Sequence, residues 1–277
     1  GSASLTGLDL AGDSLWSTVI EREPCPWPWW EMPTPAPVQV AGGVSDGEPF
    51  FAVGCGDIQV RCFDAIGREQ WRWRYNEGVP GRVVVTEMDG SGEPRIVVGG
   101  DILSDQSTCR ILQPDGDLIA ELPVEGWTSM QTALAFGEVG GSQLIGCGAS
   151  RGTNLHLFGL DDSTWERRWM KRLGGRVAGI HIAAGPERVL AATSQGFLLC
   201  YDLEGSLVWH RLFEQGIAHL TPMQDGVLVV DAAGGLSWAG LNGLMKEIGA
   251  LPGPCSFTAR AGAAVCLASG SQVFTSP

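Results

Sequence analysis

Short apolar runs that favour β-strands, separated by turns of Gly, Asp and Asn, fill the chain from end to end. The clearest set begins with strands predicted at residues 176–184 and 188–193. A Ser-Gln-Gly turn then leads to a strand at Phe197–Tyr201, and a tight turn at residues 202–205 leads to a fourth strand at Leu207–Leu212. Almost no segment carries the 3.6-residue period of a helix. The pattern therefore predicts an all-β protein with almost no helix.

A signature of Asp, then Gly three residues later and Trp seven residues later, repeats along the chain. Complete copies begin at Asp9, Asp64 and Asp202, and degenerate copies are marked by Asp115, Asp161 and Asn242. The intervals between these markers are 55, 51, 46, 41 and 40 residues, which bracket the ~40–50 residues of one four-stranded propeller blade. The sequence therefore predicts a six-bladed β-propeller of four-stranded antiparallel blades. The Asp and Gly would form a turn, and the Trp would pack between neighbouring blades.

The first strands of the six blades are predicted near six positions: Pro37, Arg82, Ser129, Arg176, Ile217 and Cys255. The last blade lacks an outer turn, whereas residues 5–20 contain a spare outer hairpin. We therefore expect the N- and C-terminal strands to pair and close the ring, which removes an exposed strand edge. Alternatively, Gln272–Thr275 is the third strand of the last blade, and the N-terminus supplies only the fourth.

One propeller domain is expected to span residues 1–277. Within it, residues 21–36 form a long loop rich in Pro and Trp, and residues 1–4 are typical of a cloning remnant.

These units resemble the quinoprotein-like (PQQ-type) propeller repeat, whose outer hairpin carries the Asp…Gly…Trp signature. Residues 87–99, Glu-Met-Asp-Gly-Ser-Gly-Glu-Pro-Arg-Ile-Val-Val-Gly, are similar to the integrin-type FG-GAP/VCBS repeat. The resemblance covers nearly the whole chain and implies a fold rather than a function. Quinone-dependent dehydrogenases of this superfamily are longer and carry two adjacent Cys residues, which this chain lacks. In calcium-binding FG-GAP loops a carboxylate stands where this chain has Arg95, so neither a PQQ cofactor nor a metal is expected.

The composition limits which binding partners and which cellular compartment are expected. The formal net charge is −13 and the pI is near 4.7, which opposes binding to the phosphate backbone of nucleic acids. No apolar stretch of 18 residues is present to span a membrane. The eight Cys residues form no Cys-x-x-Cys pair, and six of them lie in apolar, strand-like runs. Free Cys residues of that kind favour a reducing compartment, so a cytoplasmic protein is expected, with a removed signal peptide as the alternative.

Four Trp residues fall in predicted connections between blades, on the face that carries the upper loops of a propeller: Trp27, Trp29, Trp30 and Trp127. The first three lie in the longest loop, which is stiffened by Pro24, Pro26, Pro28 and Pro33. Rigid exposed aromatic side chains suit contact with a peptide, a partner protein or a carbohydrate. The alternative is that this loop folds over the ring closure and buries its Trp side chains as a lid.

Polar residues on the predicted inner strands form a second candidate site. His181 and His219 lie on the first strands of adjacent blades, and Arg82 and Arg176 open such strands at the mouth of the channel. Together these residues would line a funnel that binds an anion. The alternative is that each His satisfies hydrogen bonds in a hydrated channel.

Two function classes remain open. Asp57, Asp101 and Asp105 on predicted loops would add an acidic rim, and residues 148–152 match G-x-S-x-G without the helix that a nucleophile elbow needs. The chain is therefore expected to be a non-catalytic module that binds a peptide or protein partner through its upper face, with a cationic segment favoured by the net charge. The alternative is a lyase- or hydrolase-like enzyme that acts on a carbohydrate or small peptide in the funnel.

Overall fold

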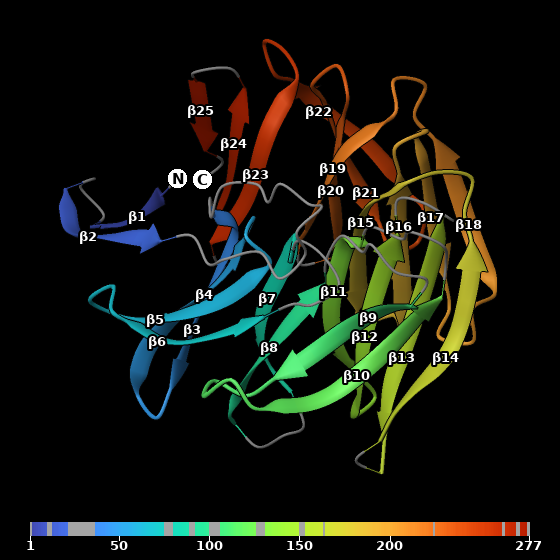
Figure 1. Cartoon of the computed structure of the whole chain (residues 1–277). Coiled ribbons are helices and arrows are strands. Elements are labelled where there is room, and N and C mark those ends of the chain that lie inside the picture. The colour runs from blue at the N-terminus through green and yellow to red at the C-terminus, as the bar shows by residue number, and fades with distance from the viewer. Residues whose placement is uncertain are drawn as a thin grey trace. The chain divides into compact units, whose positions relative to one another are not determined.

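Every described element of the protein is a β-strand (Figure 1). The computed structural model describes residues 2–9, 13–21, 37–74, 80–88, 92–99, 106–125, 131–149, 153–162, 164–223, 225–261, 264–269 and 272–275. The chain divides into two compact units, Gly1–Gln131 and Thr132–Pro277. In each sheet every strand pairs with its neighbours along the chain, and the pairs with a described register are antiparallel. The all-β prediction is confirmed.

The first unit contains a two-stranded hairpin followed by two four-stranded sheets. The hairpin is β1 (Ser2–Leu8) and β2 (Ser14–Glu21). The first sheet is β3 (Pro37–Ser45), β4 (Glu48–Cys55), β5 (Gln59–Asp64) and β6 (Glu69–Arg74), and the second is β7 (Arg82–Glu87), β8 (Pro94–Gly99), β9 (Gln106–Leu112) and β10 (Leu118–Glu125). Apolar side chains of both four-stranded sheets form one core between them, with Ala52 and Val60 on one side and Ile96 and Val98 on the other.

The second unit contains three four-stranded sheets and one sheet of three strands. The first is β11 (Gln131–Val139), β12 (Ser142–Ala149), β13 (Asn154–Asp161) and β14 (Thr164–Arg172), and the second is β15 (Val177–Ala183), β16 (Arg188–Thr193), β17 (Phe197–Tyr201) and β18 (Leu207–Leu212). The third is β19 (Ile217–Pro222), β20 (Gly226–Asp231), β21 (Gly235–Gly240) and β22 (Met245–Ala250), and the last is β23 (Cys255–Ala261), β24 (Ala264–Ser269) and β25 (Gln272–Thr275). Of the strands predicted for residues 176–212, the last three match the structure at both ends, and the first differs by one residue at each end.

The signature Asp residues build the outer turns as predicted. In the first four-stranded sheet, Oδ1 of Asp64 accepts hydrogen bonds from the backbone N–H groups of Ile66 (3.0 Å) and Arg68 (2.9 Å). Gly67 follows with a φ of 77°, in the left-handed region that favours glycine. The turn after β17 repeats the arrangement with Asp202 and Gly205. A short polar side chain that accepts backbone N–H groups and a glycine with positive φ together close each turn.

The signature Trp residues dock on the turn of the following blade, which confirms their predicted role. The indole Nε1 of Trp71 on β6 donates to the carbonyl of Pro114 (2.6 Å), and its ring lies against Gly116 in the turn after β9. Trp209 on β18 repeats this contact with the carbonyl of Leu241 at 3.0 Å. Trp16 on β2 packs against Gly67. Each Trp thus joins two consecutive sheets with both apolar contact and a polar anchor where Nε1 reaches a carbonyl.

The degenerate copies of the signature differ in detail from the predicted positions. In the turns after β9 and β21, Gly116 and Gly243 donate to the carbonyls of Gln113 and Gly240, so these turns begin two residues before the markers at 115 and 242. In the copy marked by Asp161 the docking residue is Trp169, eight rather than seven residues after the marker, and its Nε1 donates to the carbonyl of Leu203 (2.8 Å). The cause is a longer hairpin: Asp161 pairs with Thr164, and four residue pairs precede the register shift that brings Trp169 opposite Leu157.

The strands at the two ends of the chain agree only in part with the prediction. Gln272–Thr275 forms β25, the third strand beside β24, as the alternative interpretation proposed. Residues at the N-terminus form both strands of a hairpin, and Ser2–Ser4 belong to β1. The expected closure of the ring joins the two units and stays a prediction.

Candidate functional site

The aromatic residues that the sequence singled out, Trp27, Trp29, Trp30 and Trp127, lie outside the described residues, as do Asp101 and Asp105. The two strands that flank the first three Trp residues are described. β2 ends at Glu21, and β3 begins at Pro37, which pairs with Cys55. Fifteen residues therefore separate these strands. The connections that follow β14, β18 and β22 have four residues each.

Arg82, in the first unit, is the first residue of β7 and pairs with Gly99. The carbonyl of Pro80, two residues before it, lies where a Cβ atom on Gly54 would stand, so this connection runs directly over the end of β4. The start of β7 therefore lies beside the end of the neighbouring sheet that carries Pro37 and the β4–β5 turn.

The other three predicted funnel residues lie in the second unit. Arg176 is exposed just before β15, and its carbonyl accepts from the N–H of Ser194 (2.8 Å). Nε2 of His219 on β19 donates to the carbonyl of Cys255 (3.1 Å). β15 and β19 lie side by side. Each strand has a bulge near its start, and counting from this bulge makes Gly179, not His181, the position equivalent to His219. His181 lies two residues further along its strand, which is a distance of about 7 Å. The anion funnel stays a prediction.

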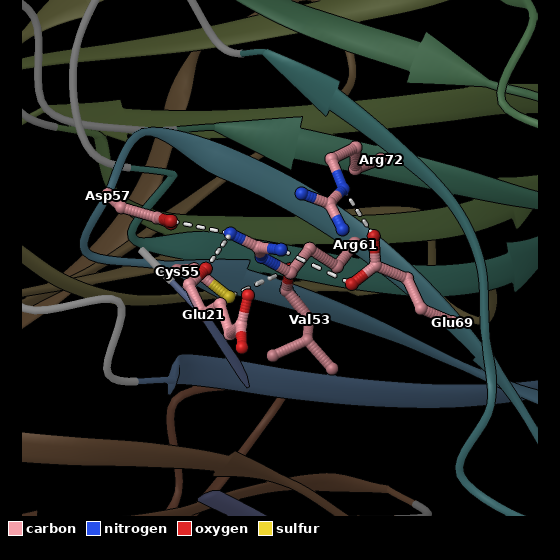
Figure 2. Close-up of polar contacts among 7 residues, drawn as sticks. All are labelled: Glu21, Val53, Cys55, Asp57, Arg61, Glu69 and Arg72. Atoms are coloured by element: carbon pink, nitrogen blue, oxygen red, sulfur yellow. Dashed lines mark hydrogen bonds and ion pairs between the residues drawn. The ribbon is translucent and has the colours of Figure 1, made fainter. Parts of the chain in front are cut away.

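A buried ionic cluster that the sequence did not predict lies at the same end of the first sheet (Figure 2). Arg61 on β5 and Asp57 in the β4–β5 turn have side chains only 1% and 0% exposed, and Nη2 of Arg61 lies 2.5 Å from Oδ2 of Asp57. The same Nη2 donates to the backbone carbonyl of Glu21 (3.1 Å), and Nη1 donates to Oε2 of Glu69 on β6 (3.2 Å). Glu69 also pairs with Arg72. One guanidinium therefore joins the turn, the adjacent strand β6 and the end of the N-terminal hairpin.

The pKa values near this cluster follow from burial and charge. Burial lowers the pKa of Arg61, but the charge and hydrogen bond of Asp57 outweigh it, so that the pKa is raised and the guanidinium stays charged. Burial raises the pKa of the Cys55 thiol to about 12, although the nearby Arg61 lowers it. Because only a thiolate is a good nucleophile, Cys55 is unreactive at neutral pH. The cluster is therefore suited to holding backbone segments in place rather than to covalent chemistry.

The structure corrects one expected role. Asp57 does not contribute to an exposed acidic rim, because its carboxylate is buried against Arg61. The available signal was a charged residue, Arg61, inside the otherwise apolar run from Val60 to Phe63, with Asp57 four residues before it. Both faces of β5 are buried, so a charged side chain on this strand needs an oppositely charged or hydrogen-bonding partner nearby.

Two further features of the described residues bear on function. No group of three or more His, Cys, Asp or Glu side chains among them is arranged to hold a metal ion. Within the same ranges, no helix has the length and apolar character that a membrane span requires.

Known structures are similar to this chain in fold. The Dos1 propeller matches with a TM-score of 0.71 and 12% identity, over 98% of this chain and 72% of that one. BBS1N, solved in complex with ARL6DN, matches with a TM-score of 0.65 and 16% identity, over 86% and 78%. Sqt1 of Saccharomyces cerevisiae matches with a TM-score of 0.66 and 14% identity, over 79% of this chain and 66% of its own length. No family model and no curated protein matches the sequence.

These matches and the sheets described above define the fold as a six-bladed β-propeller of antiparallel blades. Five blades have four described strands each, and β23–β25 belong to the sixth. At these sequence identities, the likeness establishes the fold and nothing further.

Proposed function

We propose that this protein is a non-catalytic binding propeller of the quinoprotein-like repeat type, which captures a peptide or protein segment in the cytoplasm. The observation that carries the proposal is the connection of 15 residues between β2 and β3, which holds three Trp and five Pro residues. Pro residues reduce the conformational entropy that a loop loses on binding, and Trp is enriched among residues that dominate binding energy.

The distribution of charge favours a partner segment that carries basic residues. Residues 1–131 contain 20 Asp and Glu but only 8 Lys and Arg, whereas residues 132–277 contain 11 and 10. Nearly all of the net negative charge therefore lies in the unit that carries the Trp-rich connection. A partner segment with basic and apolar residues is attracted to this unit, and its association weakens as salt screens the charges. The match to BBS1N, which was solved in complex with another protein, agrees with this role.

A displayed peptide library tests the proposal. Peptides enriched on the wild-type protein should be basic, and replacing Trp29 and Trp30 with Ala should weaken their binding about tenfold or more. Calorimetry measures the affinity, and scanning calorimetry measures the melting temperature of the same samples. A matched control replaces two exposed apolar residues of β18, Leu207 and Leu212, with Ala.

Two results would contradict the proposal. In the first, the Trp29→Ala/Trp30→Ala variant binds the enriched peptides as well as the wild type does. In the second, the variant loses many degrees of melting temperature, which would mean that the Trp side chains are a structural lid.

A further inference from the structure

The densest positive charge in the chain lies on one strand of the second unit and on the connection after it. Residues 167–176 contain five Lys and Arg and no Asp or Glu, although the formal net charge of the chain is −13. Residues 167–172 belong to β14, and residues 173–176 lead to β15. The five cations, which we call the basic edge, are Arg167, Arg168, Lys171, Arg172 and Arg176. Such a segment favours a ligand with negative charge.

The outer edge of β14 also offers backbone groups for pairing. β14 is the last strand of its sheet, and no described strand pairs with its other edge (Figure 1). The N–H of Leu173 donates to the carbonyl of Thr153 on the β13 side (2.7 Å), and the register with β13 is regular from Trp169 to Arg172. In an antiparallel ladder, residues whose N–H and C=O groups point to the partner strand alternate with residues whose groups point away. The N–H and C=O groups of Met170 and Arg172 therefore point to the outer edge.

Positive charge lies on both faces of this edge. A Cβ atom on Gly205 would meet Cε of Lys171 and the ring of Trp169, so these two side chains face the turn of the following blade. Arg172 alternates with them and is exposed on the opposite face. Arg176 is exposed in the connection beyond the end of the strand. A peptide strand laid beside β14 therefore meets a cation on each of its faces.

Protection of an edge strand does not account for this much charge of one sign. Charged side chains of either sign are enough to keep edge strands from pairing with other chains. The last strands of the other blades carry less charge or a balanced charge: β6 has two Arg and one Glu, β10 has two Glu, β18 has one Arg, and β22 has one Lys and one Glu. β14 has four cations and one Glu over nine residues. Asp161 pairs with Arg168 (2.5 Å), which still leaves an excess of positive charge on the strand.

We propose that the basic edge is a docking site for an extended acidic segment of a partner protein, which adds to the sheet as a fifth strand. The backbone of the segment pairs with Met170 and Arg172, and its Asp and Glu side chains lie beside Arg172 on one face and Lys171 on the other. Main-chain hydrogen bonds supply affinity, and the opposite charges supply specificity. This site lies in the other unit from the Trp-rich connection and takes a partner of opposite charge, so it does not depend on the proposed function.

The strand edge favours a protein segment over other anions. A nucleic acid has negative charge but no peptide backbone to pair with a strand, and the net charge of −13 opposes its phosphates. A second copy of the chain offers an acidic edge in β10, which has two Glu residues. A contact between unlike edges of two copies, however, leads to rings or filaments. Each of these two ligands is an outcome of the experiment below.

Fluorescence anisotropy measures the binding of a labelled peptide of about ten residues, built from Glu, Thr and Val. The wild type should bind this peptide at least about tenfold more tightly than the matched peptide in which Gln replaces Glu, and salt should weaken the binding. Arg172→Glu with Arg176→Glu should weaken it about tenfold or more. The control, Arg188→Glu with Lys246→Glu, changes the net charge equally on other blades of the same unit and should stay within about twofold of the wild type.

Amide hydrogen exchange, resolved by NMR, tests the strand addition on the wild-type protein. In the free protein the amides of Met170 and Arg172 should exchange faster than those of Lys171 and Leu173, because only the latter two point to β13. The Glu-containing peptide should slow exchange at Met170 and Arg172 about tenfold or more and leave the other two amides unchanged.

Several results would overturn the proposal. The wild type does not bind the Glu-containing peptide, or the control variant loses as much affinity as Arg172→Glu/Arg176→Glu does. The peptide binds, but exchange at Met170 and Arg172 does not change. A single-stranded oligonucleotide displaces the peptide at a lower concentration than the unlabelled peptide does, which would assign the basic edge to nucleic acid. Sedimentation shows that the wild type self-associates and that the charge-reversed variant does not, which would assign it to a second copy.

If the charge-reversed variant does not fold, Arg172→Gln with Arg176→Gln takes its place. This variant removes the two charges without introducing repulsion, so it should weaken peptide binding about threefold or more. Wild-type affinity in Arg172→Gln/Arg176→Gln would refute the role of the basic edge.

Discussion

The contact of Trp71 with the next blade gives a stability prediction whose size follows from the structure. Trp71 is half-buried, its ring lies on Gly116, and its Nε1 donates to the carbonyl of Pro114. A half-buried Trp removes about 100 Å² of apolar surface from water, which is worth about 2.5 kcal/mol. The hydrogen bond adds about 1 kcal/mol. Trp71→Ala should therefore lower the free energy of unfolding by about 3.5 kcal/mol.

A second substitution separates the two contributions. Trp71→Phe keeps most of the apolar contact and removes only the donor, so it should lower the free energy of unfolding by about 1 kcal/mol. Urea unfolding followed by far-UV circular dichroism measures both values, because this signal reports mainly on the backbone and not on one side chain. Trp165→Phe is the control, since Trp169 rather than Trp165 docks on the following blade. A loss below 1 kcal/mol in Trp71→Ala, or equal losses in the two Trp71 variants, would refute this account of how blades are joined.

Two further predictions concern a turn and a thiol. Gly67 and Gly47 have nearly the same φ, 77° and 79°, but a Cβ atom would meet the ring of Trp16 only at Gly67. Gly47→Ala should therefore lower the free energy of unfolding by about 1 kcal/mol, and Gly67→Ala by more than 2 kcal/mol, in urea titrations. Burial, and then the charge of Asp64, raise the pKa of Cys62 from 9.0 to about 12. Stability from the protonated thiol is therefore complete below pH 9 and decreases as the pH rises towards 12. Scanning calorimetry between pH 8 and 11 should show a smaller decrease for Cys62→Ala than for the wild type, and equal slopes would contradict the shift.

Local rules explain why the blades were predictable from sequence. The Asp64 and Asp202 turns depend on residues at most four apart, so their signature is visible in one short segment. The position of Trp169 depends instead on the number of residue pairs in the hairpin β13–β14, which a fixed spacing from Asp161 does not capture. Strand existence was therefore easier to predict than the register within a degenerate copy.

The candidate site was less predictable, because it depends on segments that are distant along the chain. Arg61 finds Asp57 four residues away, but its third acceptor, Glu21, is 40 residues away and contributes only a backbone carbonyl. No side-chain pattern records such a partner. His219 illustrates the same limit, since the carbonyl of Cys255 that it contacts lies 36 residues later.

The pairing of each strand with its neighbours along the chain has a consequence for biosynthesis. A blade needs only its own contiguous segment to complete its hydrogen bonds, so it can form as soon as that segment leaves the ribosome. The indole of Trp71 then meets its acceptor only 43 residues later, and that of Trp209 only 32 residues later. Assembly can therefore advance one blade behind translation at the blades whose last strand carries a docking indole, as β6, β14 and β18 do.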